Sequence, residues 1–167
     1  MSDSPTVVWL LGSDSDLPHV ESGFKVLRQF DVPFEVRILS AHRTPDAVEE
    51  VVSGARERGV KVLIGVAGGA AHLPGVIAAR TTLPVIGVPV PTSFAGGLDS
   101  LLSISQMPGG IPVATVGANK GGGKNAALLA TSILSTTDNR LAEALTAYRQ
   151  DMAEAVLRKD QDQASAS

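Results

Sequence analysis

A histidine and an arginine stand side by side in this chain, and together they could transfer a proton beside an anion. They belong to residues 40–45, which read SAHRTP. Pro45 suits the first turn of a helix and Thr44 is a natural N-cap, so His42 and Arg43 would lie just before a helix N-terminus. There an arginine can bind phosphate through paired hydrogen bonds, and a histidine can act as acid or base near neutral pH. A histidine in a loop is more often only a polar surface residue, so His42 needs support from other segments.

Residues 12–16 read GSDSD and form a second candidate segment. Free backbone N–H groups at the start of a helix favour an anion, and the Ser13 hydroxyl could add a donor. Aspartates repel phosphate, so one of the two is better suited to accept hydrogen bonds from sugar hydroxyls. A simpler interpretation, in which Ser15 or Asp16 only caps the helix, fits equally well. The segment is not G-x-G-x-x-G, which disfavours a dinucleotide site.

Residues 67–75 read AGGAAHLPG and form a third candidate segment. Small residues at a strand end bring bare backbone close to a ligand, in a tight cavity walled by N–H groups and methyl groups. A tight turn with positive φ would explain Gly68 or Gly69 alone. His72 directly precedes a helical segment, so capping is slightly better supported for it than a chemical role.

Two other kinds of site are disfavoured. Residues 118–125 resemble a P-loop, but Ala118 replaces its first glycine and Asn125 replaces the hydroxyl residue that would hold magnesium. The three histidines have no i, i+4 pair and no accompanying carboxylate cluster, and cysteine is absent. We therefore expect neither nucleoside triphosphate hydrolysis nor metal catalysis.

Five short apolar runs predict strands that are buried on both faces. They are Thr6–Leu11, Phe34–Leu39, Lys61–Val66, Pro84–Val88 and Pro112–Val116. Segments of helical length separate them: Leu17–Phe30, Pro45–Arg58, Leu73–Thr81 and Leu98–Gln106. This alternation predicts an α/β fold with a parallel sheet covered by helices.

Two further helical segments follow the fifth run. Residues Gly123–Leu134 are almost wholly apolar, which predicts burial within the domain or between subunits. In the last segment apolar residues recur every three or four positions from Leu141 to Val156, and Asp138 suits its N-cap. We expect one domain over residues 1–158 and a frayed polar tail over residues 159–167.

The order of the strands would decide whether the three segments meet. Ligands of such sheets bind beyond the carboxyl ends of the strands. If the order is 2-1-3-4-5, as in the flavodoxin-like fold, the second and third strands flank the first. The residues then brought into one pocket are Ser13, Asp16, His42, Arg43, Gly68 and His72. Such a pocket would bind an anion, accept hydrogen bonds from hydroxyl groups and place an imidazole beside a cavity lined by backbone. These properties suit a sugar phosphate that undergoes proton transfer.

The composition of the chain indicates which kinds of binding partner to expect. The net charge of −3, with no long basic run, disfavours nucleic acid. With 44% apolar and only 19% charged residues, the chain is apolar for its length, which predicts a homo-oligomer. Met1–Thr6 is no secretory signal and no apolar run is long enough to span a membrane, so we expect a cytoplasmic protein.

These segments together resemble the class I N5-carboxyaminoimidazole ribonucleotide mutases, the family of bacterial phosphoribosylaminoimidazole carboxylase catalytic subunits. The matching segments are GSDSD (12–16), SAHRTP (40–45), AGGAAHLPG (67–75), PVIGVPV (84–90), DSLLSISQMPGGIPVATV (99–116) and NAALLA (125–130). They match in order and spacing, and SAHRTP together with AGGAAHLPG is highly specific. Residues 117–124 hold more glycine and lysine than the family pattern.

The resemblance implies a flavodoxin-like three-layer sandwich with a five-stranded parallel sheet and a C-terminal helical extension, assembled as an octamer. It implies conversion of N5-carboxyaminoimidazole ribonucleotide to 4-carboxy-5-aminoimidazole ribonucleotide in de novo purine (IMP) synthesis, without ATP, metal or other cofactor. His42 would be the catalytic residue. The implied substrate contacts are Ser13, Asp16, Ser40, Arg43, Gly68, Gly69, Ala70, His72 and Leu73.

Other functions fit less well. Class II relatives carboxylate aminoimidazole ribonucleotide with free carbon dioxide, but they resemble SAHKT and lack the AAHLPG run, so Arg43 and Ala70–Gly75 favour class I. A flavin module would place aromatic rings near the pocket, whereas Trp9 falls in the first strand and Tyr148 in the last helix. A receiver domain would need an aspartate at the end of the third strand, where Ala67-Gly68 stand.

Overall fold

The computed structural model describes residues 4–166, which form two compact units that meet in sequence between Ala130 and Thr131. The strands are β1 (Val7–Leu11), β2 (Phe34–Ile38), β3 (Val62–Gly68), β4 (Val85–Val90) and β5 (Ala114–Thr115). The helices are η1 (Asp14–Asp16), α1 (Leu17–Gln29), α2 (Pro45–Ser53), α3 (Leu73–Ala78), η2 (Ala95–Gly97), α4 (Leu98–Ser105), α5 (Gly122–Ser135) and α6 (Asn139–Ser165).

The first unit is built on a parallel sheet with the order β2-β1-β3-β4-β5. This confirms the predicted α/β fold and strand order. Every residue of β1 and β4 is buried, as predicted, whereas no residue of the edge strands β2 and β5 is buried, so the prediction of burial on both faces was wrong for these two strands. Strand β5 is shorter than predicted, because only Ala114 and Thr115 pair with β4. Pro112 has no N–H to donate to a ladder, so the run cannot pair from its first residue.

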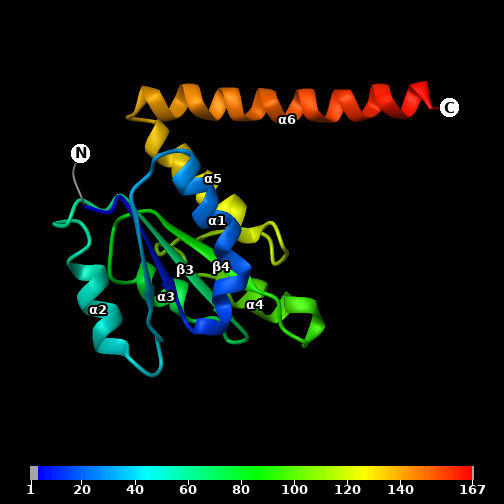
Figure 1. Cartoon of the computed structure of the whole chain (residues 1–167). Coiled ribbons are helices and arrows are strands. Elements are labelled where there is room, and N and C mark those ends of the chain that lie inside the picture. The colour runs from blue at the N-terminus through cyan, green and yellow to red at the C-terminus, as the bar shows by residue number, and fades with distance from the viewer. Residues whose placement is uncertain (1–3, 167) are drawn as a thin grey trace. The chain divides into compact units, whose positions relative to one another are not determined.

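Helices cover both faces of this sheet (Figure 1). On one face α2, α3 and α4 bury an aliphatic cluster that includes Val8, Leu63 and Ile77. On the other face Trp9 packs edge-to-face on Phe24 of α1, with ring centroids 5.2 Å apart. Together these contacts give the three layers that the sequence predicted.

Helix α1 passes very close to the start of α5. A Cβ on Gly23 would collide with the Gly123 carbonyl oxygen and would lie 2.8 Å from the ring of Trp9. The two glycines therefore allow both helices to pack on the same face of the sheet.

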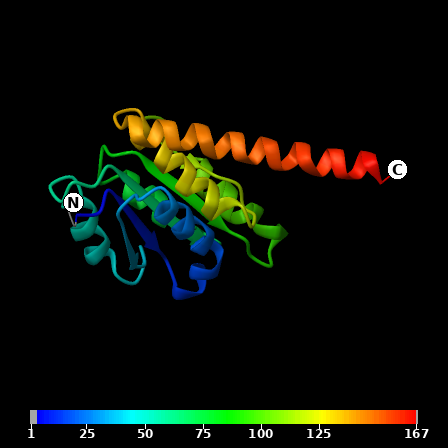
Figure 2. The ribbon, with the colours of Figure 1, turned by 45° about the horizontal axis from the view of Figure 1, so that its top comes forward.

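The second unit contains α6, a single continuous helix (Figure 2). Asp138 is its N-cap, as predicted, and accepts hydrogen bonds from the backbone N–H groups of Arg140 and Leu141. The helix runs to Ser165, whereas we expected residues 159–167 to be frayed; Ser167 lies outside the described residues. Lys, Arg, Gln and Ala are good helix formers, and Glu154 pairs with Arg158 one turn later. None of the helices within residues 4–166 is both long and apolar enough to cross a membrane.

Candidate active site

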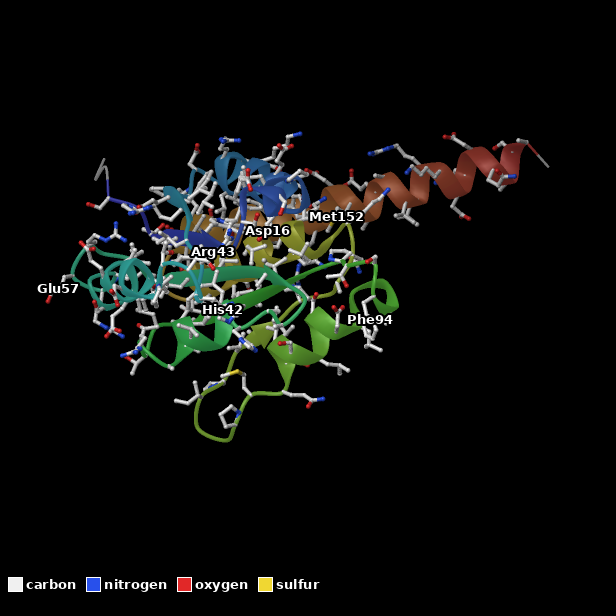
Figure 3. The ribbon with its side chains drawn as sticks, turned by 90° about the horizontal axis from the view of Figure 1, so that it is seen from below. Asp16, His42, Arg43, Glu57, Phe94 and Met152 are labelled. Carbon is white, nitrogen blue, oxygen red and sulfur yellow. The ribbon has the colours of Figure 1, made fainter. Side chains whose placement is uncertain are left out.

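One cavity of about 550 Å³ lies beyond the carboxyl ends of β1, β2, β3 and β4, a volume suited to a small-molecule ligand. Because β1 lies between β2 and β3, the loops that follow these three strands meet there. Of the predicted site residues, Ser13, Asp16, Ser40, His42, Arg43, Gly68, Ala70, His72 and Leu73 line the cavity, and Gly69 does not. Figure 3 shows Asp16, Arg43 and His42 near one another.

The first loop holds a buried carboxylate. The side chain of Ser13 caps η1 by accepting from the N–H of Ser15, and Asp16 Oδ2 accepts from the N–H of Ser13 at 3.0 Å. Asp16 occupies the N-cap position of α1, as the simpler interpretation expected, but its side chain makes no capping bond there and instead completes the capping box of η1 with Ser13. Burial raises the pKa of Asp16, and hydrogen bonds from the Ser13 and Gly12 N–H groups together with His19 only partly offset it. The Asp16 carboxylate lines the cavity, and the Ser13 N–H reaches it at Oδ2.

In the second loop, residues 40–44, the Thr44 hydroxyl makes hydrogen bonds to the backbone of Ser40. Thr44 Oγ1 accepts from the N–H of Ser40 at 2.9 Å and donates to the Ser40 carbonyl, so its side chain does not cap α2. Arg43 reaches the first loop, where Nη2 donates to the Gly12 carbonyl at 2.9 Å. No carboxylate within residues 4–166 forms a salt bridge with Arg43. Its positive charge is therefore available to an anion.

A second hollow adjoins the cavity at Arg43. It measures about 310 Å³ and shares Gly12, Ser13, Ser40 and Arg43 with the first. Arg43 therefore lies where the two hollows meet, with serine hydroxyls beside it.

The two histidines of the site are joined by a hydrogen bond. His42 Nε2 and His72 Nδ1 lie 2.7 Å apart and the rings meet edge to face. His72 occupies the N-cap position of α3, but its side chain makes no capping bond. A hydrogen bond between two ring nitrogens needs one proton and one lone pair, so the bonded pair can carry at most one extra proton.

The third loop is a tight turn. Gly69 has a φ of +67°, as a glycine in this position can, and Ala71 has a φ of +42°. The Ala71 N–H donates to the Gly68 carbonyl. No residue of the described chain accepts from the N–H of Ala70, which lies in the cavity wall. The turn therefore offers an open backbone donor to a ligand.

Sequence reasoning missed the contribution of the loop after β4. Val90 and Thr92 line the cavity, and Thr92 Oγ1 lies 2.9 Å from an oxygen of Asp99. Their position at and just after the end of β4 was the only available signal, because neither residue type indicates chemistry. The glycine-rich residues 117–124 contribute nothing to the cavity lining. Within the described residues no cluster of His, Cys, Asp or Glu could hold a metal ion.

Comparison with known proteins decides the family. The pattern of the family described as AIR carboxylase matches residues 6–155 of this chain. The chain belongs to the AIR carboxylase family. This membership confirms the resemblance seen in the sequence segments.

Members of the AIR carboxylase family with curated functions are closely similar. The N5-carboxyaminoimidazole ribonucleotide mutase of Pyrococcus abyssi is 56% identical over 148 residues, covering 89% of this chain and 84% of that protein. The mutase of the same name from Bacillus subtilis is 52% identical over 153 residues, covering 92% of this chain and 94% of that protein.

A solved structure shares the fold. The crystal structure of Treponema denticola PurE superposes with a TM-score of 0.84 at 31% identity, covering 95% of this chain and 98% of that chain. The flavodoxin-like fold assignment is therefore supported by an experimental structure as well as by strand order.

Proposed function

We propose that this chain is an isomerase of purine synthesis that converts N5-carboxyaminoimidazole ribonucleotide to 4-carboxy-5-aminoimidazole ribonucleotide. The observation that carries the proposal is the meeting of His42, Arg43, Asp16 and the open Ala70 N–H around one cavity. The mutase names of relatives that are more than half identical to the chain support the substrate and product.

The substrate is held by its two polar ends. Arg43 binds the phosphate where the two hollows meet, with the hydroxyl of Ser40 as a further donor; the hydroxyl of Ser13 can join them once it exchanges its hydrogen bond to Asp14 Oδ1 for the phosphate. Asp16 accepts from ribose hydroxyls, which suits a carboxylate that is already partly satisfied by the Ser13 N–H. These contacts direct the aminoimidazole ring toward His42.

His42 transfers the proton twice. As a cation it protonates the exocyclic nitrogen, and the bond between that nitrogen and the carboxylate breaks to release carbon dioxide. The electron-rich C4 of the ring then forms a bond to the carbon of carbon dioxide. Neutral His42 finally takes the proton from C4 and the ring becomes aromatic again, which returns His42 to its starting charge.

The His42–His72 pair suits this cycle. With its hydrogen bond intact, the pair holds either one extra proton or none, and these are the two states that the cycle needs. We therefore place His72 beside the reacting ring, where it also contacts the substrate.

Carbon dioxide must be retained between the two bond changes. Gly68, Ala70, Ala71, His72 and Leu73 form one wall of the cavity, and Ala71 and Leu73 are buried there. The Ala70 N–H is placed to hydrogen-bond an oxygen of the carboxylate before and after transfer. Escape of carbon dioxide would leave aminoimidazole ribonucleotide instead of product.

In a single chain the proposed active site is open to solvent, and we expect a neighbouring subunit to cover it. His42 and His72 are exposed in the single chain, and the nearby segment of η2 and α4 presents Phe94, which is 72% exposed, and Leu98, which is 49% exposed. Exposed apolar side chains of this size mark an interface. We propose a homo-oligomer, for which the family resemblance implies an octamer.

The direct test is conversion by the purified chain with no ATP or metal added. We expect N5-carboxyaminoimidazole ribonucleotide to be consumed and the 4-carboxylated product to appear in the ultraviolet spectrum. Efficient product formation from aminoimidazole ribonucleotide and bicarbonate, with no conversion of the N5-carboxylated compound, would instead indicate the class II carboxylase.

A further inference from the structure

Two serines of α4 hold the third loop in place. Ser100 is wholly buried, and its Oγ accepts from the Gly69 N–H at 2.9 Å while donating to the Val90 carbonyl at 2.8 Å. Gly68 and Val90 are the last paired residues of β3 and β4, so the Ser100 hydroxyl bridges the two strands where their ladder ends. Ser103, one turn further along the same face of α4, donates to the Ala70 carbonyl.

These bonds fix the peptide groups on both sides of one open peptide. The Gly69 N–H and the Ala70 carbonyl are held by the two serines, and the Gly68 carbonyl is held by the Ala71 N–H. Between them lies the Gly69–Ala70 peptide, whose N–H has no partner in the described chain. The serines thus satisfy the groups that face away from the ligand and leave this N–H unused.

We propose that Ser100 and Ser103 are positioning residues that aim the Ala70 N–H at the migrating carboxylate and so retain carbon dioxide during transfer. The inference rests on the proposed function, because it assigns these serines to the step in which carbon dioxide is free. Neither serine lines the cavity, so they act through the loop and do not contact the substrate.

The turn needs such support because its backbone is unfavourable. Ala71 has a positive φ, which a residue with a Cβ adopts only when its surroundings impose it. Without the two hydroxyls the turn could relax to an ordinary conformation, and the peptide between Gly69 and Ala70 would rotate. Alanine at either position would pack in the helix as well as serine does, but it could not make these hydrogen bonds. The positioning role therefore belongs to the hydroxyl groups.

The test measures how the reaction divides between two products. N5-carboxyaminoimidazole ribonucleotide is given to excess enzyme, and the ratio of aminoimidazole ribonucleotide to 4-carboxylated product is measured after subtraction of spontaneous loss without enzyme. We expect S100A to raise this ratio about fivefold or more, in line with the loss of buried hydrogen bonds, and S103A to raise it about twofold or more, because the Ser103 bond is more exposed. S103T retains a hydroxyl and should restore the ratio of the unmodified chain.

The matched control is Ser53→Ala, which removes a helix hydroxyl bonded to the Glu49 carbonyl on α2, outside the active-site cavity. Its ratio should equal that of the unmodified chain. Since Ser100 is buried, S100C tests the same hydrogen bonds at nearly constant volume if S100A folds poorly.

Slower turnover with an unchanged ratio in the α4 variants would overturn the positioning role while leaving the proposed function standing. If the unmodified chain forms no 4-carboxylated product at all, the proposed function fails, and the retention role fails with it.

Discussion

His42 and His72 come from different loops yet share one hydrogen bond, and we propose that the bonded pair serves the two proton transfers of the reaction. Residue types and strand-end positions predicted that His42 and Arg43 would lie in one pocket, and both line the cavity, although a lone loop histidine is more often a polar surface residue. The residue types could not show that the His72 side chain bonds to His42 and does not cap α3. Which nitrogen a histidine presents depends on the neighbour that the fold brings to it, here from a strand on the other side of β1.

Replacing His42 with Asn should lower turnover by about a thousandfold or more, because both proton transfers depend on this ring. Substrate binding should change little, since Arg43 and Asp16 hold the other parts of the ligand. Steady-state kinetics and equilibrium binding would check both statements. His19 supplies the control: it is exposed and outside the cavity, so H19N should keep turnover within about twofold of the unmodified chain.

Replacing Asp16 with Asn should raise stability near neutral pH while weakening substrate binding about tenfold or more. The raised pKa means that the folded state holds the proton more tightly than the unfolded state. Stability from this group is therefore present in acid and is lost as the pH rises through the folded-state pKa. Asn carries no charge there, so the Tm difference between D16N and the unmodified chain should grow from pH 4 to pH 7. An equal difference at both pH values would contradict the account.

At the scale of elements, the strands were predictable because three of them are buried on both faces and read as unbroken apolar runs. The ends of the helices were harder to predict than the strands. Residues 54–58 were expected to continue α2, but the helix stops at Ser53 with Gly54 as its C-cap, and the chain then turns to a Gly59 with a φ of +88°. The support given by Ser100 was also invisible, because a serine in a helical segment gives no sign of what its hydroxyl will face.

The close crossing of α1 and α5 makes a separate prediction. G23A should lower the free energy of unfolding by about 2–3 kcal/mol, because the added methyl would collide with the Gly123 carbonyl and with the ring of Trp9. Trp9 is the only tryptophan in the chain and is fully buried, so its fluorescence reports unfolding in urea directly. Gly109 has open space around it, and G109A should leave the unfolding curve nearly unchanged. Similar curves for G23A and G109A would show that the crossing is looser than described.

At the scale of the whole molecule, an apolar composition predicts association, and the exposed apolar side chains indicate where we expect a partner copy to bind. Phe94, which precedes η2, and Leu98 and Leu102 of α4 are exposed apolar side chains close in sequence to Thr92; together they are called the exposed apolar surface. A neighbouring copy seated there would shield both this surface and the open side of the cavity. No single-chain pattern could have identified these residues in advance, since Phe94 lies in a loop without periodicity.

The family resemblance implies an octamer, so light scattering after gel filtration should give about eight times the 17.2 kDa of one chain. Phe94→Glu places a charge on the exposed apolar surface and should shift the protein to smaller species with reduced turnover. E57Q, on an exposed residue away from η2 and α4, is the control and should keep the larger mass (Figure 3). A monomer at micromolar concentration for the unmodified chain would contradict the assembly.

The central claim is that the carboxylate never leaves the niche beside residues 68–73. N5-carboxyaminoimidazole ribonucleotide labelled with ¹³C in its carboxylate would be converted in the presence of a large excess of unlabelled bicarbonate, and the product would be analysed by mass spectrometry. Retained carbon dioxide predicts that almost every product molecule keeps the label. A product that carries mainly unlabelled carboxylate would mean that carbon dioxide exchanges with solvent, and the niche would not be the trap described.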